Sequence, residues 1–184
     1  MKVETGSLLI SRPAMLDPNF DGTVVLVCTH DEHGTVGLTL NRPLEIKLED
    51  MLPEDSGLED IASLEIPLLW GGPVGTDCLH VLSGPEQDPL SVMTVLPGVF
   101  FGGDMELVRN TLDKAGQLRF FIGYSGWSPG QLDEELAAEA WFVVPGSVAD
   151  VWTTDWRLLW ERLMAKIDPQ FAWMKDIPAN PDVN

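Results

Sequence analysis

The sequence predicts an α+β fold, mixed, with a largely antiparallel, curled and pseudo-barrel-like sheet and with helices mainly in the C-terminal half. Three observations predict it. Expected strands outnumber expected helices, the first half of the chain is nearly all strand, and strands do not alternate regularly with helices as they do in a doubly wound sheet. The length of 184 residues fits one domain, which we expect over residues 1–167, with residues 168–184 as a C-terminal tail.

Short apolar runs that are rich in β-branched residues and bounded by Gly, Pro, Asn or Asp are typical of strands. Eight runs have this pattern and are expected to be strands: 8–10, 23–30, 35–41, 66–70, 78–82, 91–96, 119–124 and 141–144. The second and third of these runs flank a short turn that ends in Gly34, and we expect them to form a hairpin. Capping signals and helical spacing of apolar residues predict helices over 104–115, 128–139 and 154–167, and single helical turns at 48–51 and 58–62.

The charge balance excludes several classes of function. Asp and Glu number 29 against 11 Lys and Arg, which gives a formal net charge of −18, and the bases are scattered. Proteins that grip phosphates need clustered cations, so we expect no direct binding to nucleic acid and none to an anionic membrane. The acid excess is interpreted as a solvated surface. The acidic residue and the lack of a long apolar run near Met1 lead us to expect no secretory signal. No apolar run is long enough to span a membrane and two cysteines form no disulfide framework, so we expect a cytoplasmic protein with free thiols.

One segment matches the pattern of a serine hydrolase. Gly126-Trp127-Ser128-Pro129-Gly130 has the form G-x-S-x-G between an expected strand and an expected helix. The residue after the nucleophile must donate a backbone N–H to the oxyanion hole, and Pro129 has none. All three histidines also precede the serine. We therefore interpret Ser128 as a helix N-cap, with Pro129 at the first helical position and Gln131 at the third, and expect its loss to cost about 1 kcal/mol.

Two further patterns could bind ligands. Cys28 and His30 form a C-x-H pair on one expected strand, and Cys78 and His80 form another. Four such side chains could hold zinc if the strands were neighbours, but the spacing matches no zinc motif, so we expect no metal or other cofactor and interpret the cysteines as small apolar residues. The glycine-bearing loop 123–126 could hold an anion, but we prefer to interpret it as a tight strand-to-helix connection.

Several segments together resemble the AlgH/YqgE family of bacterial proteins, in order and spacing, from about residue 5 to 165. They are Gly6-Ser7-Leu8-Leu9-Ile10, Asp17-Pro18-Asn19-Phe20, His30 with Gly34, Gly37-Leu38-Thr39-Leu40-Asn41-Arg42-Pro43, Gly71-Gly72-Pro73-Val74, Leu79-His80 and Gly123-Tyr124-Ser125-Gly126-Trp127-Ser128-Pro129-Gly130-Gln131-Leu132. The resemblance implies a cytosolic α+β protein with a curled sheet and without an established catalytic activity. Some members of the family are named as transcriptional regulators, and a charge of −18 would make such regulation act through a protein partner.

Two functions are expected from these observations. The first is a non-enzymatic regulatory or protein-interaction domain with a protein partner. The alternative is a protein that binds a small molecule or an anion, with or without catalysis, in a polar pocket between loops. The residues that would build this pocket are His30, Asn41, Arg42, His80, Tyr124 and Gln131.

Overall fold

The computed structural model describes residues 2–50, 66–84, 92–103, 108, 109, 111 and 117–168. Within these residues the strands are β1 (Ser7–Ser11), β2 (Val24–Asp31), β3 (Gly34–Thr39), β4 (Leu68–Trp70), β5 (Val74–Gly84), β6 (Met93–Leu96), β7 (Val99–Phe101), β8 (Gln117–Trp127) and β9 (Trp141–Pro145). The helices with assigned bounds are α3 (Gln131–Ala137), α4 (Val148–Val151) and α5 (Leu159–Ile167), with 3₁₀ turns η1 (Leu48–Asp50) and η2 (Trp156–Leu158).

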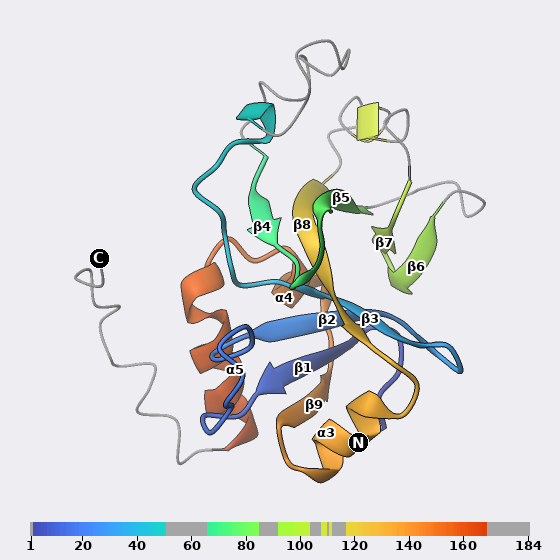
Figure 1. Cartoon of the computed structure of the whole chain (residues 1–184). Coiled ribbons are helices and arrows are strands. Elements are labelled where there is room, and N and C mark those ends of the chain that lie inside the picture. Colours follow the sequence, from blue (N-terminus) through green and yellow to red (C-terminus); the bar gives the residue numbers. More distant parts are fainter. Residues whose placement is uncertain are drawn as a thin grey trace.

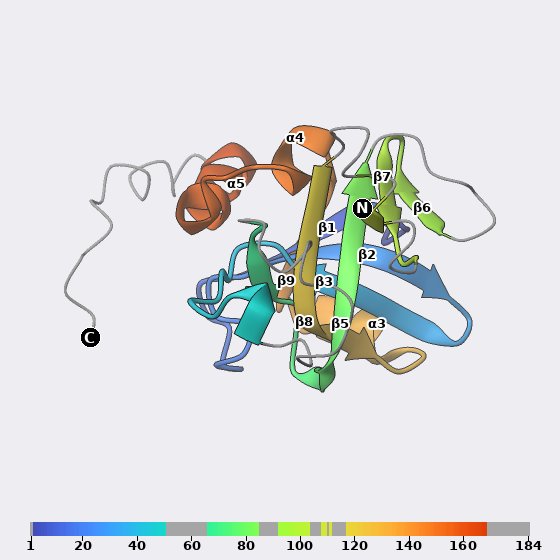
Figure 2. The same cartoon turned by 90° about the horizontal axis from the view of Figure 1, so that it is seen from above.

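The nine strands form one curled sheet in the order β6-β7-β5-β8-β3-β2-β1-β9, and β4 pairs with β8 outside this path. Every pairing is antiparallel except that of β4 with β8. Figure 1 shows the sheet with α5 along one side and α3 near β9, and Figure 2 shows the long strands β5 and β8 crossing over β2 and β3. The predicted α+β class with a mostly antiparallel, curled sheet is confirmed; the sheet is not closed.

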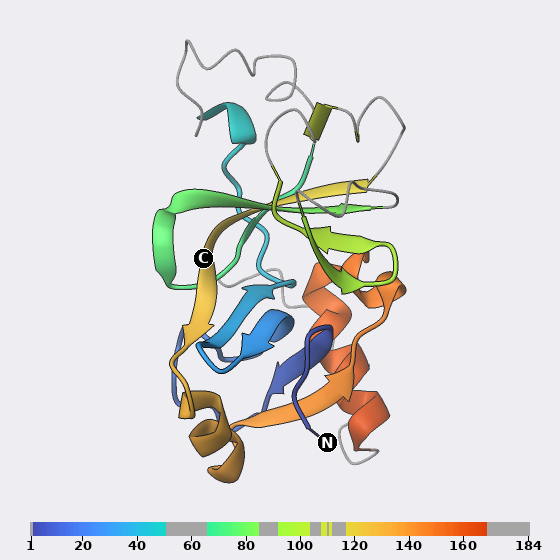
Figure 3. The ribbon, with the colours of Figure 1, turned by 90° about the vertical axis from the view of Figure 1, so that its right-hand side faces the viewer.

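Strand β8 joins the two halves of the sheet. Its first part pairs with β5 and β4, and its last residues pair with β3. The change of partner occurs next to Gly123, which has a φ of +66° and whose added Cβ would lie 2.5 Å from the carbonyl oxygen of Gly72. Only glycine fits such a close approach at this backbone angle. Figure 3 shows the β5–β8 half lying across the β1–β2–β3–β9 half, with α5 beside the latter.

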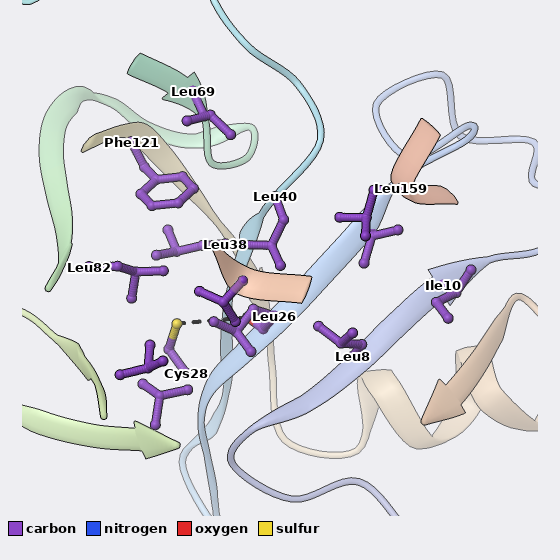
Figure 4. Packing of buried hydrophobic residues seen from close by; sticks show 14 of the residues in the cluster. Leu8, Ile10, Leu26, Cys28, Leu38, Leu40, Leu69, Leu82, Phe121 and Leu159 are labelled. Carbon is purple, nitrogen blue, oxygen red and sulfur yellow. Dashed lines mark hydrogen bonds between the residues drawn. The ribbon is translucent and has the colours of Figure 1, made fainter. Parts of the chain in front are cut away.

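The main core lies inside the curl. Figure 4 shows how Leu8, Leu26, Leu82 and Phe121 converge there from four strands, together with Cys28. Cys28 is buried among them, and its thiol lies 3.7 Å from the carbonyl oxygen of Leu26. Burial raises the pKa of the Cys28 thiol far above its ordinary value. The interpretation of this cysteine as a small apolar residue is confirmed.

Arg119 ties the C-terminal segment to the sheet. Although it is charged, it is only 3% exposed, and its guanidinium donates to the carbonyl oxygens of Val151 and, at 2.8 Å, Thr153. The same group lies over the rings of Trp152 and Trp156, 5.6 and 5.4 Å from their centroids. Burial lowers the pKa of Arg119 to about 10. Helix α4 and the chain after it are thus held on β8 by one buried cation.

Most predicted elements are present, with changed bounds. The hairpin of β2 and β3 is confirmed, while β7 and α4 had no predicted counterpart. The last helix begins with the 3₁₀ turn η2, and its apolar face packs on the core. Most of the predicted helix 104–115, the turn at 58–62 and the tail beyond residue 168 lie outside the described residues. The division of the chain at residue 167 therefore stays a prediction.

Candidate functional site

Four aromatic rings from four separate segments lie together at one end of the sheet. The Phe20 ring stacks on Trp127 with centroids 6.0 Å apart, meets Trp141 edge-on at 5.4 Å and lies 6.5 Å from Trp70. Trp127 and Trp141 meet edge-on at 6.0 Å. Offset and edge-on pairs at these distances are favourable beyond the area that they bury. The four rings therefore form one cohesive cluster.

A tight turn brings Phe20 into this cluster. The Asp17 carboxylate accepts a hydrogen bond from the Asn19 amide at 2.8 Å, and the Asp17 carbonyl accepts one from the Phe20 amide at 2.9 Å. Asp side chains favour such turns because they replace a backbone acceptor. The turn is closed by Thr23, whose hydroxyl donates to the Phe20 carbonyl at 2.8 Å. Phe20 is thus fixed by local chemistry.

Asn41 holds the end of the same loop. Its amide oxygen accepts from the Val24 N–H at 2.9 Å, and its amide nitrogen donates to the Gly22 carbonyl at 2.8 Å. Both bonds satisfy backbone groups between the turn and β2. Asn41 therefore positions the loop that carries Phe20 and presents its amide to the backbone.

Arg42 holds the loop from the other side. Its guanidinium donates to the Asp21 carbonyl at 2.9 Å and lies over the Trp70 ring, 5.4 Å from the centroid. Burial lowers the pKa of the Arg42 guanidinium below its ordinary value, and the carboxylates of Asp21 and Asp17 partly offset this effect. Arg42 thus connects the loop to the aromatic cluster through Trp70.

A turn after β8 starts helix α3. The Gln131 amide donates to the Ser128 carbonyl at 3.0 Å, with Pro129 second and Gly130 third, and Gly130 has φ 81° and ψ −19°. These features define a type II turn. The N-cap is Gly130, and no side chain of the described residues caps the helix there, so the prediction that Ser128 caps it is wrong. The Gln131 side chain accepts a hydrogen bond from the Ser128 amide at 3.1 Å.

Glu135 links the helix to the two indoles. Its Oε2 accepts a hydrogen bond from Trp127 Nε1 at 2.9 Å and from Trp141 Nε1 at 2.7 Å. Its Oε1 accepts from Gln131 Nε2 at 3.0 Å, one helical turn earlier. Bonds to an ionised acceptor are stronger than neutral ones. Glu135 therefore fixes both indole rings while its charge is met by neutral donors alone.

A cavity of about 540 Å³ lies between this helix and the loop. Met15, Phe20, Trp127 and Trp141 provide its apolar lining, and Leu16 at its edge is 95% exposed. The ionisable side chains that line it among the described residues are acidic, namely Asp17, Glu135 and Glu139, and Glu139 lies 3.5 Å from Arg12. We call this space the aromatic cavity. Its chemistry suits a ligand that is apolar and positively charged.

A second, shallower cavity of about 460 Å³ lies on the other side of the end of β8. Tyr124, Ser128 and the hairpin residues Asp31, His33 and Thr35 are among its lining residues.

The structure places the six predicted site residues in different surroundings. Gln131 lines the aromatic cavity, and Asn41 and Arg42 hold its loop wall as described above. Tyr124 lines the second cavity, and the His80 ring meets it edge-on at 5.6 Å. His30 bonds to Thr35 across the hairpin, with Nδ1 2.7 Å from the hydroxyl oxygen. The six residues do not surround one common cavity of the described structure.

His80 has a buried ring nitrogen that makes no hydrogen bond to the described residues. This nitrogen is Nε2, and the ring packs on Phe101 at 5.9 Å. Burial lowers the pKa of His80 below its ordinary value of 6.5. The ring is therefore held in its neutral form near neutral pH.

The two C-x-H pairs differ in surroundings. Cys28 is buried in the core, whereas Cys78 is exposed beside Asp77. No group of three or more His, Cys, Asp or Glu side chains in the described part of the chain could hold a metal ion. The same described residues contain no helix that is long and apolar enough to cross a membrane.

The family model described as AlgH-like matches residues 8–172. The chain belongs to the AlgH-like family. It is 36% identical to a UPF0301 protein of Chlorobaculum tepidum over 99% of this chain and 96% of that protein. It is 37% identical to a UPF0301 protein of Streptomyces avermitilis over 98% of this chain and 95% of that one. The resemblance seen in the sequence is confirmed, and the family has no established function.

Two solved structures share the fold of this AlgH-like chain. A protein of Corynebacterium diphtheriae matches with a TM-score of 0.78 and 20% identity, over 97% of this chain and 94% of that one. The solution structure of AlgH from Pseudomonas aeruginosa matches with a TM-score of 0.71 and 25% identity, over 98% of this chain and all of that one. Both matches extend over nearly the whole chain and support the curled-sheet architecture.

The sequence analysis does not identify Phe20 as a member of the aromatic cluster, or Glu135 as the residue that bonds to its two indoles. Glu135 follows Gln131 by four residues, which places both on one face of the helix, and this spacing is the signal that could have identified it. Nothing local connects Phe20 to two tryptophans near the other end of the chain. That contact depends on the pairing of β1 with β2 and β9, which brings both segments to one edge.

Proposed function

We propose that this AlgH-like protein is a non-enzymatic binding protein that takes a basic, hydrophobic segment of a partner protein into the aromatic cavity. One observation carries the proposal: the lining is apolar and aromatic, while Asp17, Glu135 and Glu139 are its ionisable groups. An apolar side chain would gain from leaving water, and an adjacent Lys or Arg would be attracted by the rim.

The charge of the whole chain supports the same partner. A net charge of −18 raises the local concentration of basic segments and repels nucleic acid. A regulatory effect on transcription would therefore act through the bound protein. Direct binding to DNA is not part of this proposal.

The absence of a catalytic arrangement among the described residues also favours binding over catalysis. Ser128 makes no hydrogen bond to a histidine there, His30 bonds to Thr35, and the His80 ring packs on aromatic side chains. A serine nucleophile needs a base within hydrogen-bond reach. The proposal therefore gives no residue a catalytic role.

A second candidate is supported by the size of the cavity. A volume of about 540 Å³ lies within the range of sites for small molecules, which is roughly 300–1,000 Å³. The acidic lining favours an organic ammonium compound and disfavours the anion that the sequence left open. The two candidates share one cavity, so one set of variants tests both.

The test is a selection of random peptides displayed on phage against the folded protein. We expect enriched peptides to combine Lys or Arg with Leu, Phe or Trp. The affinity of a synthetic, selected peptide is then measured by fluorescence anisotropy. Leu16→Ser and Glu139→Lys should each weaken binding about fivefold or more, which is about 1 kcal/mol.

Matched controls separate the cavity from general effects. Val148 is exposed on α4 and Glu134 is exposed on α3, and neither lines the aromatic cavity. Val148→Ser and Glu134→Lys should leave affinity within about twofold. Peptides without basic residues, or equal losses in cavity and control variants, would overturn the proposal. Displacement of the peptide by benzyltrimethylammonium would support the second candidate.

A further inference from the structure

The outer edge of β9 is open among the described residues. β9 is the last strand of the sheet order and pairs with β1 on its other side. A strand at the edge of a sheet presents backbone N–H and C=O groups that can pair with another chain. The question is which groups β9 offers and what they would bind.

The register of β1 and β9 determines which groups face outward. The Arg12 amide donates to the Ala140 carbonyl at 3.0 Å, and the Gly146 amide donates to the Gly6 carbonyl at 2.9 Å. In an antiparallel pair, hydrogen-bonded positions alternate with unbonded ones. Phe142 and Val144 therefore bond to β1, since they pair with Ile10 and Leu8. The backbone groups of the alternate residues, Trp141 and Val143, therefore face away from β1.

Trp141 and Val143 direct their backbone groups to the outer edge. Each offers one N–H donor and one C=O acceptor, and Pro145 adds an acceptor but has no N–H. The open edge is thus short and ends in a proline, which limits extended pairing. It can accept a segment of a few residues only.

This edge is continuous with the aromatic cavity. Ala140 and Trp141 line the cavity, and Trp141 is also the first residue of β9. Figure 3 shows α3 at one end of β9 and α5 beside it. A chain that is paired with Trp141 lies next to the cavity and can insert a neighbouring side chain into it.

We propose that an extended, basic segment of a partner protein adds as a short strand to the outer edge of β9 and places one apolar side chain in the aromatic cavity. This inference rests on the proposed function and states how the partner is held. Backbone bonds to Trp141 and Val143 supply the orientation of the segment, and the cavity selects its side chain.

Charge selects this occupant over a second copy of the chain. A second copy would bring another net charge of −18 to an edge that begins just after the exposed residue Glu139, whose carboxylate lies 3.5 Å from Arg12. Symmetric pairing of two β9 strands would also set Pro145 of each copy opposite Trp141 of the other, where the missing N–H leaves a carbonyl unbonded. A basic segment avoids both the charge repulsion and the unbonded carbonyl.

The first test is amide hydrogen exchange, followed by NMR, with the selected peptide described above. In the free protein, the amides of Trp141 and Val143 should exchange rapidly, while those of Phe142 and Val144 are protected by β1. Saturating peptide should slow exchange at Trp141 and Val143 by about tenfold or more. The other two amides serve as internal controls.

The second test removes backbone N–H donors, first from β9 of the protein and then from the bound peptide. Val143→Pro deletes an outward N–H and leaves the bonds of Phe142 and Val144 to β1 in place. Its folding is checked by thermal denaturation, and peptide affinity should fall about tenfold. Peptides that are N-methylated at alternate backbone positions test the same bonds from the ligand side without changing the protein, and one of the two methylation patterns should abolish binding.

The outcomes separate this inference from the proposed function. If Leu16→Ser weakens binding but Trp141 and Val143 stay unprotected, strand addition is wrong while the cavity proposal stands. Equal binding of both methylated peptides overturns strand addition in the same way. Protection of Trp141 and Val143 in the free protein would show that the edge is already covered, and would also overturn it.

Discussion

Removal of the Glu135 carboxylate tests whether one side chain organises the aromatic cavity. Glu135→Ala deletes the acceptor of two indole N–H groups, on Trp127 and Trp141, which are 4% and 3% exposed. Neither indole N–H has another hydrogen-bond partner among the described residues, so the variant leaves two buried donors without acceptors. A buried donor without a partner costs more than a bond exchanged for water.

The expected loss follows from those two bonds. Hydrogen bonds to a charged group contribute roughly 1.5–3 kcal/mol each when buried, which would give about 3–6 kcal/mol. Glu135 is only half-buried, so water can reach part of the vacated space, and we expect about 2–4 kcal/mol. At about 2–4 °C per kcal/mol in a chain of this length, the melting temperature should fall by about 4–16 °C.

Urea denaturation followed by tryptophan fluorescence measures the change. Glu134→Ala is the matched control, because Glu134 is the preceding residue of α3 and is exposed. Glu135→Gln keeps a neutral acceptor for both indoles and should lose only about 1 kcal/mol. If Glu135→Ala and Glu134→Ala lie within about 0.5 kcal/mol of each other, the two indole bonds do not contribute as the geometry indicates.

Four further outcomes are expected. Arg119→Met should lower the free energy of unfolding in urea by about 3 kcal/mol, because it leaves the buried Val151 carbonyl without its donor; a loss below about 1 kcal/mol would contradict this. Burial lowers the pKa of His80 below 6.5 in the folded protein, so the unfolded chain binds the proton at a higher pH than the folded protein does. As pH falls below about 6.5, the free energy of unfolding of the wild type should therefore decrease relative to that of His80→Gln. In native protein, a thiol reagent should modify Cys78 quickly and Cys28 only after unfolding; equal rates would refute the buried thiol. In mobility-shift titrations at ~0.15 M salt we expect no sequence-dependent binding of duplex DNA at nanomolar protein.

Much of the fold could be predicted because it depends on local patterns. The hairpin of β2 and β3 follows from two apolar runs around Gly34, and α5 follows from apolar residues at helical spacing. The predicted start of α3 lies a few residues too early, because Ser128 resembles an N-cap in the sequence. The dipeptide Pro129-Gly130 indicates a type II turn instead, since glycine adopts the positive φ of the third turn position without strain. We therefore expect Ser128→Ala to change the free energy of unfolding very little.

The candidate site could be predicted only in part, because its residues meet through strand pairing. Asn41 and Arg42 were chosen as polar residues of a loop, and the structure uses both to hold the backbone near Phe20. A polar residue that supports a site and one that contacts a ligand have the same pattern in a sequence. Only the partners of each side chain distinguish the two roles.

The use of arginine inside the fold strengthens the case for a basic partner. Three arginines lie over aromatic rings, with the guanidinium 4.1–5.6 Å from a ring centroid: Arg12, Arg42 and Arg119. Arg162 lies 3.3 Å from the carboxylate of the buried Asp150. Arg12 also lies 3.5 Å from the exposed carboxylate of Glu139 and offsets part of that charge, whereas Arg119 is buried on the sheet. The net charge of −18 attracts basic segments from a distance, and the aromatic cavity then discriminates among them by their apolar side chains.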